Sequence, residues 1–513
     1  MRQRHSVLLS FALVAAQSWC LPAAAQAPSP PSPPKPSAPS TSAPARQPHS
    51  SEQLVAAVEE KWTGDLDGML ERRMIRILVT PTRTQYWIDR GQQNGAEYEL
   101  SQAFERWINS RYPNKKHIKT RVVIVPASRD KLISGLLEGR GDIAAGALTL
   151  TEDRLRVVDY GGPFVLGVKE LAVSGPESPR IDSVDDLSGK RVFVRRSSSY
   201  WSHLARLNQQ FATRGLAPVQ VDAAPEDLRD DDILEMVGAG LVDITIVDRY
   251  EALLWGKVFP KLKVNEGVVV NSNGAFGWLI RRPSPKLQDE INQFARKFGQ
   301  GTEFGNTVIK KYIGSTKYAK DARSADAMKR FNATVDFFRK YGSQYSLDYL
   351  LMIAQGYQES ELKQSARSPV GAIGIMQLMP ATGKAMKVGD IYQAGPNVHG
   401  GVKFTRAMID EYFANEPMDD LNKTLFAFAA YNCGPGRVRQ LRTIAAQRGL
   451  NPNVWFDNVE LIAAEKIGAE TVGYVSNIYK YYVAYTLVAT QTAARDSAMA
   501  RTARRADSAR RSP

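Results

Sequence analysis

Three short segments in the last third of the chain decide its fold: Gln358-Glu359-Ser360, Gly374-Ile375-Met376-Gln377-Leu378-Met379-Pro380 and Ala430-Tyr431-Asn432-Cys433-Gly434. Before the first segment, apolar residues recur at helical spacing after Ser346, a residue type that caps helix N-termini; they are Leu347, Leu350, Leu351 and Ala354. Glu359 lies one position off this apolar stripe. Its carboxyl group is therefore expected at the edge of the core, where partial burial raises a carboxyl pKa toward the range of a general acid.

In this order and spacing, the segments resemble the motifs of the soluble lytic transglycosylases, goose-lysozyme-like enzymes that cleave peptidoglycan. The resemblance covers residues 331–490 and implies a mainly α, lysozyme-like domain with Glu359 as its single catalytic acid/base. Ile375 stands where the family usually has Leu. The resemblance further implies substrate contacts by Ser360, Ser368, Gly374, Met376, Gln377, Tyr431, Asn432 and Tyr474.

A single acid implies a particular reaction. Glycoside cleavage ordinarily uses two carboxyl groups that flank the bond. The resemblance implies instead that Glu359 protonates the glycosidic oxygen and then, as a carboxylate, takes the proton from the C6 hydroxyl of the substrate itself. The expected product is a 1,6-anhydro sugar, and a well-placed hydroxyl substitutes for the second carboxylate.

Residues 72–315 alternate short β-branched runs with amphipathic stretches, which predicts an α/β domain. Two short motifs resemble those of periplasmic amino-acid-binding proteins: Leu-Thr-Leu-Thr-Glu-Asp-Arg at 148–154 and Asp-Asp-Leu-Ser-Gly-Lys-Arg-Val at 185–192. Such proteins have two lobes that close over a ligand. The resemblance implies one lobe made of residues 72–168 and 275–315, and a second lobe made of the interval between them.

This second resemblance also implies a site for an α-amino acid. Arg154 would clamp the carboxylate with its planar fork, and Asp248 would meet the amine. A structural ion pair for Arg154 and a helix-cap role for Asp248 remain open alternatives. Arg195 and Arg196 stand where a Gly is usual before the serines. The other implied contacts are an aromatic wall, a hydroxyl and backbone N–H groups at a helix N-terminus, supplied by Tyr86, Thr149, Ser198 and Ser199.

The chain ends differ from the rest in composition. Basic residues, an apolar run and Ala23-Ala24-Ala25 predict a signal peptide over residues 1–25. Residues 26–71 form a predicted Pro-rich linker with a short N-terminal segment, and residues 28–48 hold nine of the 28 prolines. A second linker is predicted at 316–330, and a disordered basic tail at 491–513.

Few other chemistries fit the composition. Once the signal peptide is removed, Cys433 is the single remaining Cys, so no internal disulfide is expected. Cys20 leaves lipid anchoring open, although the bulky Trp19 precedes it. The five His residues are scattered, so neither a metal nor another cofactor is predicted. Asp230-Asp231-Asp232 is interpreted as a solvated turn.

Together the two resemblances point to the F-type membrane-bound lytic transglycosylases: a multidomain exported protein, periplasmic or peripheral to the outer membrane. The expected partners are peptidoglycan glycan strands and an amino acid or muropeptide. Nucleic acid is not expected, because eight of the 14 net positive charges lie in residues 1–51 and in the tail from residue 495, outside the predicted folded regions. The alternative is a non-catalytic periplasmic receptor that binds such ligands and glycan. The ligand, the cleavage mode and the stem-peptide preference are not predicted.

Overall fold

The computed structural model describes residues 58, 60–89, 91–113, 118–316 and 325–511. The predicted signal peptide and the Pro-rich residues 28–48 lie outside these ranges. Within them, no helix is both long and apolar enough to cross a membrane.

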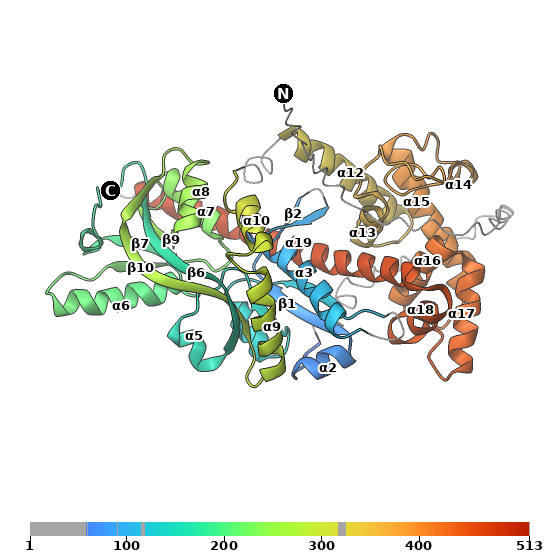
Figure 1. Cartoon of the computed structure of the whole chain (residues 1–513). Helices are drawn as coiled ribbons and strands as arrows, with labels where there is room; N and C mark the ends of the chain where they lie inside the picture. The colour runs from blue at the N-terminus through green and yellow to red at the C-terminus, as the bar shows by residue number, and fades with distance from the viewer. Residues whose placement is uncertain (1–57, 59, 90, 114–117, 317–324, 512–513) are drawn as a thin grey trace, which may run out of the picture. The chain divides into compact units, whose positions relative to one another are not determined.

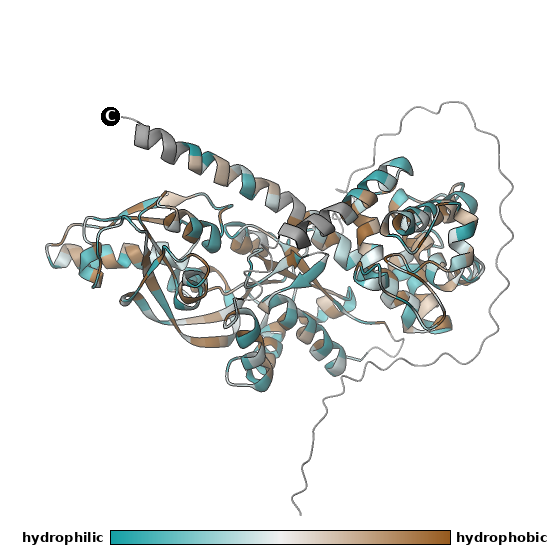
Figure 2. Ribbon diagram, turned by 90° about the horizontal axis from the view of Figure 1, so that it is seen from above, coloured by the Kyte–Doolittle hydropathy of each residue, from teal (hydrophilic) through white to brown (hydrophobic). Residues whose placement is uncertain are grey.

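The first domain is built on a mixed sheet of six strands in the order β4-β1-β5-β10-β6-β9. Figure 1 labels four of these strands, β1, β6, β9 and β10. β1 pairs in parallel with β4 and β5, and its β-branched residues are buried because helices cover both faces. Hydrophobic stretches alternate with hydrophilic ones along the strands of this domain in Figure 2. The strand bounds are β1 Met74–Val79, β4 Arg121–Pro126, β5 Ile143–Ala145, β6 Asp159–Ser174, β9 Ile244–Asp248 and β10 Lys263–Ile280.

Two long antiparallel strands connect the two lobes of this domain. β6 pairs with β10 from Asp159 opposite Ile280 to Ser174 opposite Lys263. The end of β10 near residue 280 also pairs with β5 of the first lobe. The end of β6 near residue 174 pairs with β9 of the second lobe. The register shifts several times between Asn265 and Trp278, and such bulges bend a strand locally. The α/β, two-lobed prediction is confirmed.

Helices and two short ribbons complete this domain. The ribbons are β2 Trp87–Asp89 with β3 Gln92–Asn94, and β7 Arg191–Arg195 with β8 Gln220–Ala224. The helices are α2 Leu66–Glu71, α3 Ala96–Arg111, α4 Lys131–Leu137, α5 Glu152–Val157, η1 Val184–Leu187, α6 Ser199–Thr213, α7 Asp230–Gly238, α8 Arg249–Gly256, α9 Pro285–Phe298 and α10 Glu303–Tyr312.

The predicted solvated turn at residues 230–232 is wrong. These residues form the first turn of α7, where the side chains of Asp231 and Asp232 are buried. Carboxylates are tolerated there because the helix N-terminus favours negative charge and because arginines pair with all three. The pairs are Arg195 with Asp230, Arg83 with Asp231, and Arg495 with Asp232.

The second domain is helical, as predicted. Its centre is α16, whose residues 424–430 are all buried against the surrounding helices. The bounds are α12 Ala325–Gln344, α13 Tyr349–Ser360, α14 Pro380–Met386, α15 Ala394–Met408, η2 Ile409–Phe413, α16 Asp420–Cys433, α17 Pro435–Gln447, η3 Trp455–Val459, α18 Glu460–Ile467 and α19 Ala469–Arg511.

The last helix, α19, extends through the segment predicted as a disordered tail. It has 43 residues and continues to Arg511. Arg495 reaches Asp232 of α7 at 2.5–3.0 Å, and Ala498 is fully buried beside Ile233 and Met236. The basic composition of this segment predicted disorder. That prediction could not take account of Asp232, the acidic partner of Arg495, because Asp232 lies more than 250 residues earlier in the chain.

A buried group of charges joins the two domains. Arg73 at the start of β1 donates to Glu460 at 2.8 Å, and Arg121 at the start of β4 lies 3.5 Å from the same carboxylate. Arg73 also donates to Asp457, which precedes α18. All but Asp457 are less than a tenth exposed. We call Arg73, Arg121 and Glu460 the interdomain ion cluster.

Candidate active site and ligand site

Glu359 occupies the last turn of α13. Asp348, rather than the predicted Ser346, caps the start of this helix by accepting from the N–H of Leu350. The helix ends directly after Glu359 and Ser360, because Glu361 adopts the left-handed conformation. The stripe of buried residues stops at Gly356, so Glu359 sits at the edge of the core, as predicted.

The environment of Glu359 suits an acid. Burial raises its pKa to about 7, and a hydrogen bond from the Tyr474 hydroxyl to Oε1 opposes that rise. At neutral pH a substantial fraction of the carboxyl group is therefore protonated. Burial and this hydrogen bond account for the shift in the pKa of Glu359, with no contribution from a second carboxylate.

Two phenols face this carboxyl group from different helices. Tyr474 comes from α19, while Tyr431 comes from α16 and donates to the carbonyl of Met376 at 2.7 Å. Burial and the charge of Glu359 raise the pKa of both hydroxyls well above the usual value. Both therefore remain protonated donors at neutral pH.

The segment 374–378 forms a tight turn beside α13. Gly374 has φ 76°, and a Cβ there would lie 2.5 Å from the amide of Gln364. The amide of Gln377 donates to the Gly374 carbonyl at 2.8 Å. Asn397, fully buried on α15, accepts from the N–H of Met376 and donates to the Ile373 carbonyl, both at 2.8 Å. The sequence reasoning missed Asn397, which lies outside the quoted motifs.

Several predicted substrate contacts have partners within the domain in this structure. Ser360 donates to the Ile375 carbonyl at 2.9 Å, which ties the catalytic helix to the turn. Ser368 accepts from the N–H of Ala372 at 2.9 Å. Asn432 accepts from the Thr471 hydroxyl at 2.7 Å. Met376 differs most from the prediction, because its side chain is fully buried in the core.

In the first domain, Arg154 bridges the two lobes. Its side chain donates to the carbonyl of Thr149 at 2.7 Å and to that of Ser197 at 2.8 Å. Burial lowers the pKa of this guanidinium to about 9. Both acceptors are backbone carbonyls, so these bonds do not form the alternative, a structural ion pair of Arg154 with Glu152 or Asp159. Asp159 instead pairs with Arg282.

Asp248 lies at the end of β9 and is 3% exposed. Its Oδ1 has no hydrogen-bond partner within the described part of the chain, and its side chain makes no capping bond to α8. Burial, followed by the nearby charge of Glu170, raises its pKa well above the usual value. A buried, unpaired acceptor of this kind favours a ligand that brings a donor or a cation.

The predicted serines have partners of their own. Ser198 caps α6, and Ser199 donates to Glu170 at 2.8 Å. The N–H of Ser197, next to the predicted anion site, donates to Glu226. Sequence reasoning missed Glu170, which is fully buried on β6 and also contacts His203 at 2.6 Å.

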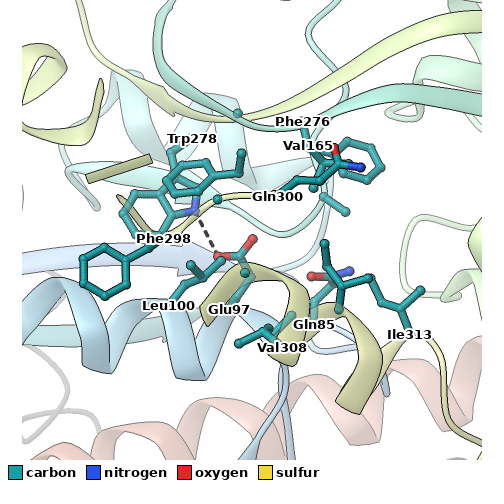
Figure 3. Close-up of a pocket in the computed structure, with 17 residues that line it drawn as sticks. Gln85, Glu97, Leu100, Val165, Phe276, Trp278, Phe298, Gln300, Val308 and Ile313 are labelled. Carbon is teal, nitrogen blue, oxygen red and sulfur yellow. Dashed lines mark hydrogen bonds between the residues drawn. The ribbon is translucent and has the colours of Figure 1, made fainter. Parts of the chain in front are cut away.

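Tyr86 does not form the predicted aromatic wall. It is fully buried in the core of the first lobe, and its hydroxyl donates to Gln93 at 2.8 Å. A neighbouring apolar pocket lies against the same core (Figure 3). Glu97 faces it and accepts from Trp278 at 2.9 Å and from the N–H of Gly146 at 3.0 Å. Both carboxylate oxygens of Glu97 are thereby occupied.

Among the described residues, no group of three or more His, Cys, Asp or Glu side chains is arranged to hold a metal ion. The partly buried Cys433 lies near the active-site helices, and burial raises the pKa of its thiol. Cys433 therefore has the character of a packing residue rather than a nucleophile.

Comparison with known proteins finds two family matches along the chain. Residues 336–453 match the Transglycosylase SLT domain, and residues 75–315 match the bacterial extracellular solute-binding proteins, family 3. A protein of Pseudomonas putida (strain GB-1) named membrane-bound lytic murein transglycosylase F is 29% identical over 458 residues, which cover 85% of this chain and 89% of that one. A protein of the same name from Aeromonas hydrophila is 26% identical over 441 residues, covering 82% and 84%.

Proposed function

We propose that this chain, which joins a family 3 solute-binding domain to an SLT transglycosylase domain, is a peptidoglycan lytic transglycosylase with a ligand-binding domain. The observation that carries the proposal is Glu359: one carboxyl group, half-protonated near neutral pH, faced by two phenols. The two relatives named membrane-bound lytic murein transglycosylase F match this chain over most of their own length.

In the proposed reaction, Glu359 protonates the β-1,4 glycosidic oxygen between N-acetylmuramic acid and N-acetylglucosamine. The bond from C1 of N-acetylmuramic acid to this oxygen breaks, N-acetylglucosamine leaves with the proton on its O4 hydroxyl, and C1 is left to bond the C6 oxygen of the same sugar. The resulting carboxylate is stabilised by the hydroxyl of Tyr474 and then accepts the proton of the C6 hydroxyl, which closes the 1,6-anhydro ring. A pKa near 7 suits both steps, because the group must give up a proton and recover one. Gly374, Gln377, Tyr431 and Asn432 are the proposed substrate contacts.

The test is digestion of purified sacculi followed by mass spectrometry. The products should end in anhydro sugars, lighter by one water than hydrolysis products and without a reducing end. Glu359→Gln should lower turnover by about 100-fold or more, because an amide cannot donate the proton. Glu361→Gln is the matched control: the same change two residues away, at an exposed carboxylate. Reducing-end products would identify a hydrolase instead.

For the first domain we propose a ligand of the amino-acid or muropeptide class, with its carboxylate near Arg154 and its amine at Asp248. The unpaired Oδ1 of Asp248 supports the second contact. Binding of amino acids and cell-wall peptides to the whole protein can be measured by calorimetry. Arg154→Ala should weaken binding by about 2–5 kcal/mol, and Arg154→Lys should restore it only in part. Absence of heat and of any thermal shift would contradict a ligand site.

Such a ligand would act on catalysis only if it binds one arrangement of the protein better than another. We propose that it changes access to Glu359, with a coupling of about 1–3 kcal/mol. Digestion rates with and without ligand, compared between the wild type and Arg154→Ala, measure that coupling. Equal rates despite demonstrated binding would leave localisation as the role of the first domain. The relatives' name supports a place in the cell envelope.

A further inference from the structure

Two buried polar side chains lie behind Tyr474 and take no direct part in the chemistry above. Gln355 is one turn before Glu359 on α13, Thr405 is on α15, and both are fully buried. The Thr405 hydroxyl donates to Gln355 Oε1 at 3.3 Å, and Gln355 Nε2 donates to the Tyr474 hydroxyl at 3.2 Å. Tyr474 in turn donates to Glu359 Oε1. Side chains from three helices thus form one directed series of hydrogen bonds that ends on the acid.

The direction of this series matters because a phenol has only one proton to donate. While Gln355 presents its NH₂ group to Tyr474, the phenol oxygen accepts, and its proton remains available to Glu359. If the amide were reversed, its oxygen would compete with Glu359 for that proton. The bond from Thr405 to Oε1 opposes the reversal, because that bond holds the carbonyl end of the amide away from Tyr474.

Packing alone does not require polar groups at these two positions. The neighbouring residues Met352, Ile353 and Ala354 on α13 are apolar and buried, and Met or Val would occupy nearly the same volumes as Gln and Thr. Polar groups placed in such a core are tolerated when every hydrogen bond is satisfied and aligned. Here the alignment leads to the catalytic carboxyl group.

We propose that Gln355 and Thr405 are positioning residues that keep Tyr474 donating to Glu359 and thereby set the proton affinity of the catalytic acid. The inference rests on the proposed function only in naming Glu359 as that acid. It extends the site by two residues that touch neither substrate nor the reacting carboxyl group.

The expected direction of the effect follows from the groups that face Glu359. These are Tyr474 from α19 and Tyr431 from α16, and both are neutral phenols, since the pKa of each is raised well above its usual value. The Tyr474 hydrogen bond lowers the pKa of Glu359, while burial raises it. Weakening this bond therefore raises the pKa, so Glu359 stays protonated to a higher pH.

The test uses Thr405→Val and Gln355→Met in the full-length protein. The titration of Glu359 is measured without substrate by infrared difference spectroscopy, in which the carbonyl band of the protonated acid is identified by its absence in Glu359→Gln. We expect titration about half to one pH unit above the wild type in both variants, with the same upward shift in the alkaline limb of sacculus digestion. Thr405→Ser keeps the hydroxyl and should restore the wild-type titration.

Thr424→Val is the matched control, because Thr424 is a similarly buried helical Thr whose hydroxyl donates to the Asp420 carbonyl at 2.8 Å. It should leave the titration of Glu359 unchanged. Wild-type titration in both test variants would overturn the proposal and leave Gln355 and Thr405 with a structural role. If Gln355→Met does not fold, the Ser and Val variants of Thr405 decide the question alone. If the two test variants shift the titration of Glu359 as expected but the wild type yields no anhydro products, the result would count against the proposed function and not against this inference.

Discussion

Burial raises the pKa of Glu359 and the hydrogen bond from Tyr474 lowers it, and these two influences could be predicted from the sequence to different degrees. Its place at the edge of a helix core was predictable, because the apolar stripe and the motif lie next to each other in the chain. Its hydrogen bonds were not predicted: Tyr474, named only as a substrate contact, is 115 residues away, and the Thr405–Gln355 bond spans 50. Helical periodicity identifies which face is buried, but it does not identify which buried polar groups meet.

The same limit explains two residues that differ from the predicted site. Met376 was assigned from the motif at residues 374–380 and Tyr86 from the resemblance to solute-binding proteins, yet both side chains are fully buried in cores. In a tight turn, side chains one or two residues apart can point to the core or to the surface. The two resemblances therefore named these residues but left the direction of their side chains undetermined.

Asp248 gives a prediction about stability. A carboxyl pKa raised by folding means that the native state binds more protons than the unfolded chain, so this group lowers stability as pH rises above its ordinary pKa of 3.8. Asp248→Asn should therefore raise the free energy of unfolding at pH 7, by about 1–3 kcal/mol, while weakening ligand binding. Denaturant unfolding at pH 7 and pH 4 measures this. The gain should shrink at pH 4, and an equal gain at both pH values would argue against a titration effect.

At the scale of elements, the active site is the meeting point of α13, α16 and α19, each of which contributes a side chain near its end. Helix α13 was predicted from its periodicity, but its stop was not. Glu361 and Leu362 both have positive φ, an arrangement that side chains other than Gly seldom adopt. No Gly or Pro marks this position in the sequence, so the usual signals for a helix end were missing.

A similar helix end permits a stability test away from the site. Lys387 ends α14 in the left-handed conformation, with φ 53°. Lys387→Gly removes the Cβ that disfavours this conformation and should stabilise the protein by about 0.5–1 kcal/mol. Lys387→Ala removes the charge but keeps the Cβ, and it should bring no such gain. Thermal or denaturant unfolding compares the two, and equal effects would mean that strain at this position is negligible.

At the scale of the whole molecule, α19 connects what the sequence treated as separate. The sequence analysis predicted a linker between the two domains at residues 316–330 and disorder after residue 490. In the structure, Tyr474 of α19 contacts the acid, Lys480 pairs with Glu105 of the first lobe at 3.0 Å, and Arg495 pairs with Asp232 of the second. One helix thus touches the catalytic site and both lobes. The two domain folds were predictable from local motifs, whereas this long-range contact was not.

Arg495 is the place to test that contact. Arg495→Ala leaves the carboxylate of Asp232, which is 1% exposed, with a weaker pairing to Arg229 at 4.0 Å. Breaking a buried pair from one side is costly, so we expect a loss of about 2–4 kcal/mol in the stability of α7 and the adjoining end of α19. Hydrogen exchange of the backbone amides in these two helices measures it. Arg501→Ala, an exposed Arg on the same helix, is the control, and equal exchange in both variants would show that the contact contributes nothing.

The interdomain ion cluster has a consequence for the order of events during synthesis. A ribosome releases Arg73 and Arg121 when more than 300 residues remain to be made before Glu460 appears. Until then these two cations lack their carboxylate partner, and the apolar core of the first domain that packs against Tyr479 and Val483 lacks part of its cover. Unpaired positive charge is well hydrated and does not recruit other nascent chains, whereas exposed apolar surface does. The junction between the two domains is therefore completed only when residues 460–483 have been made, near the end of synthesis.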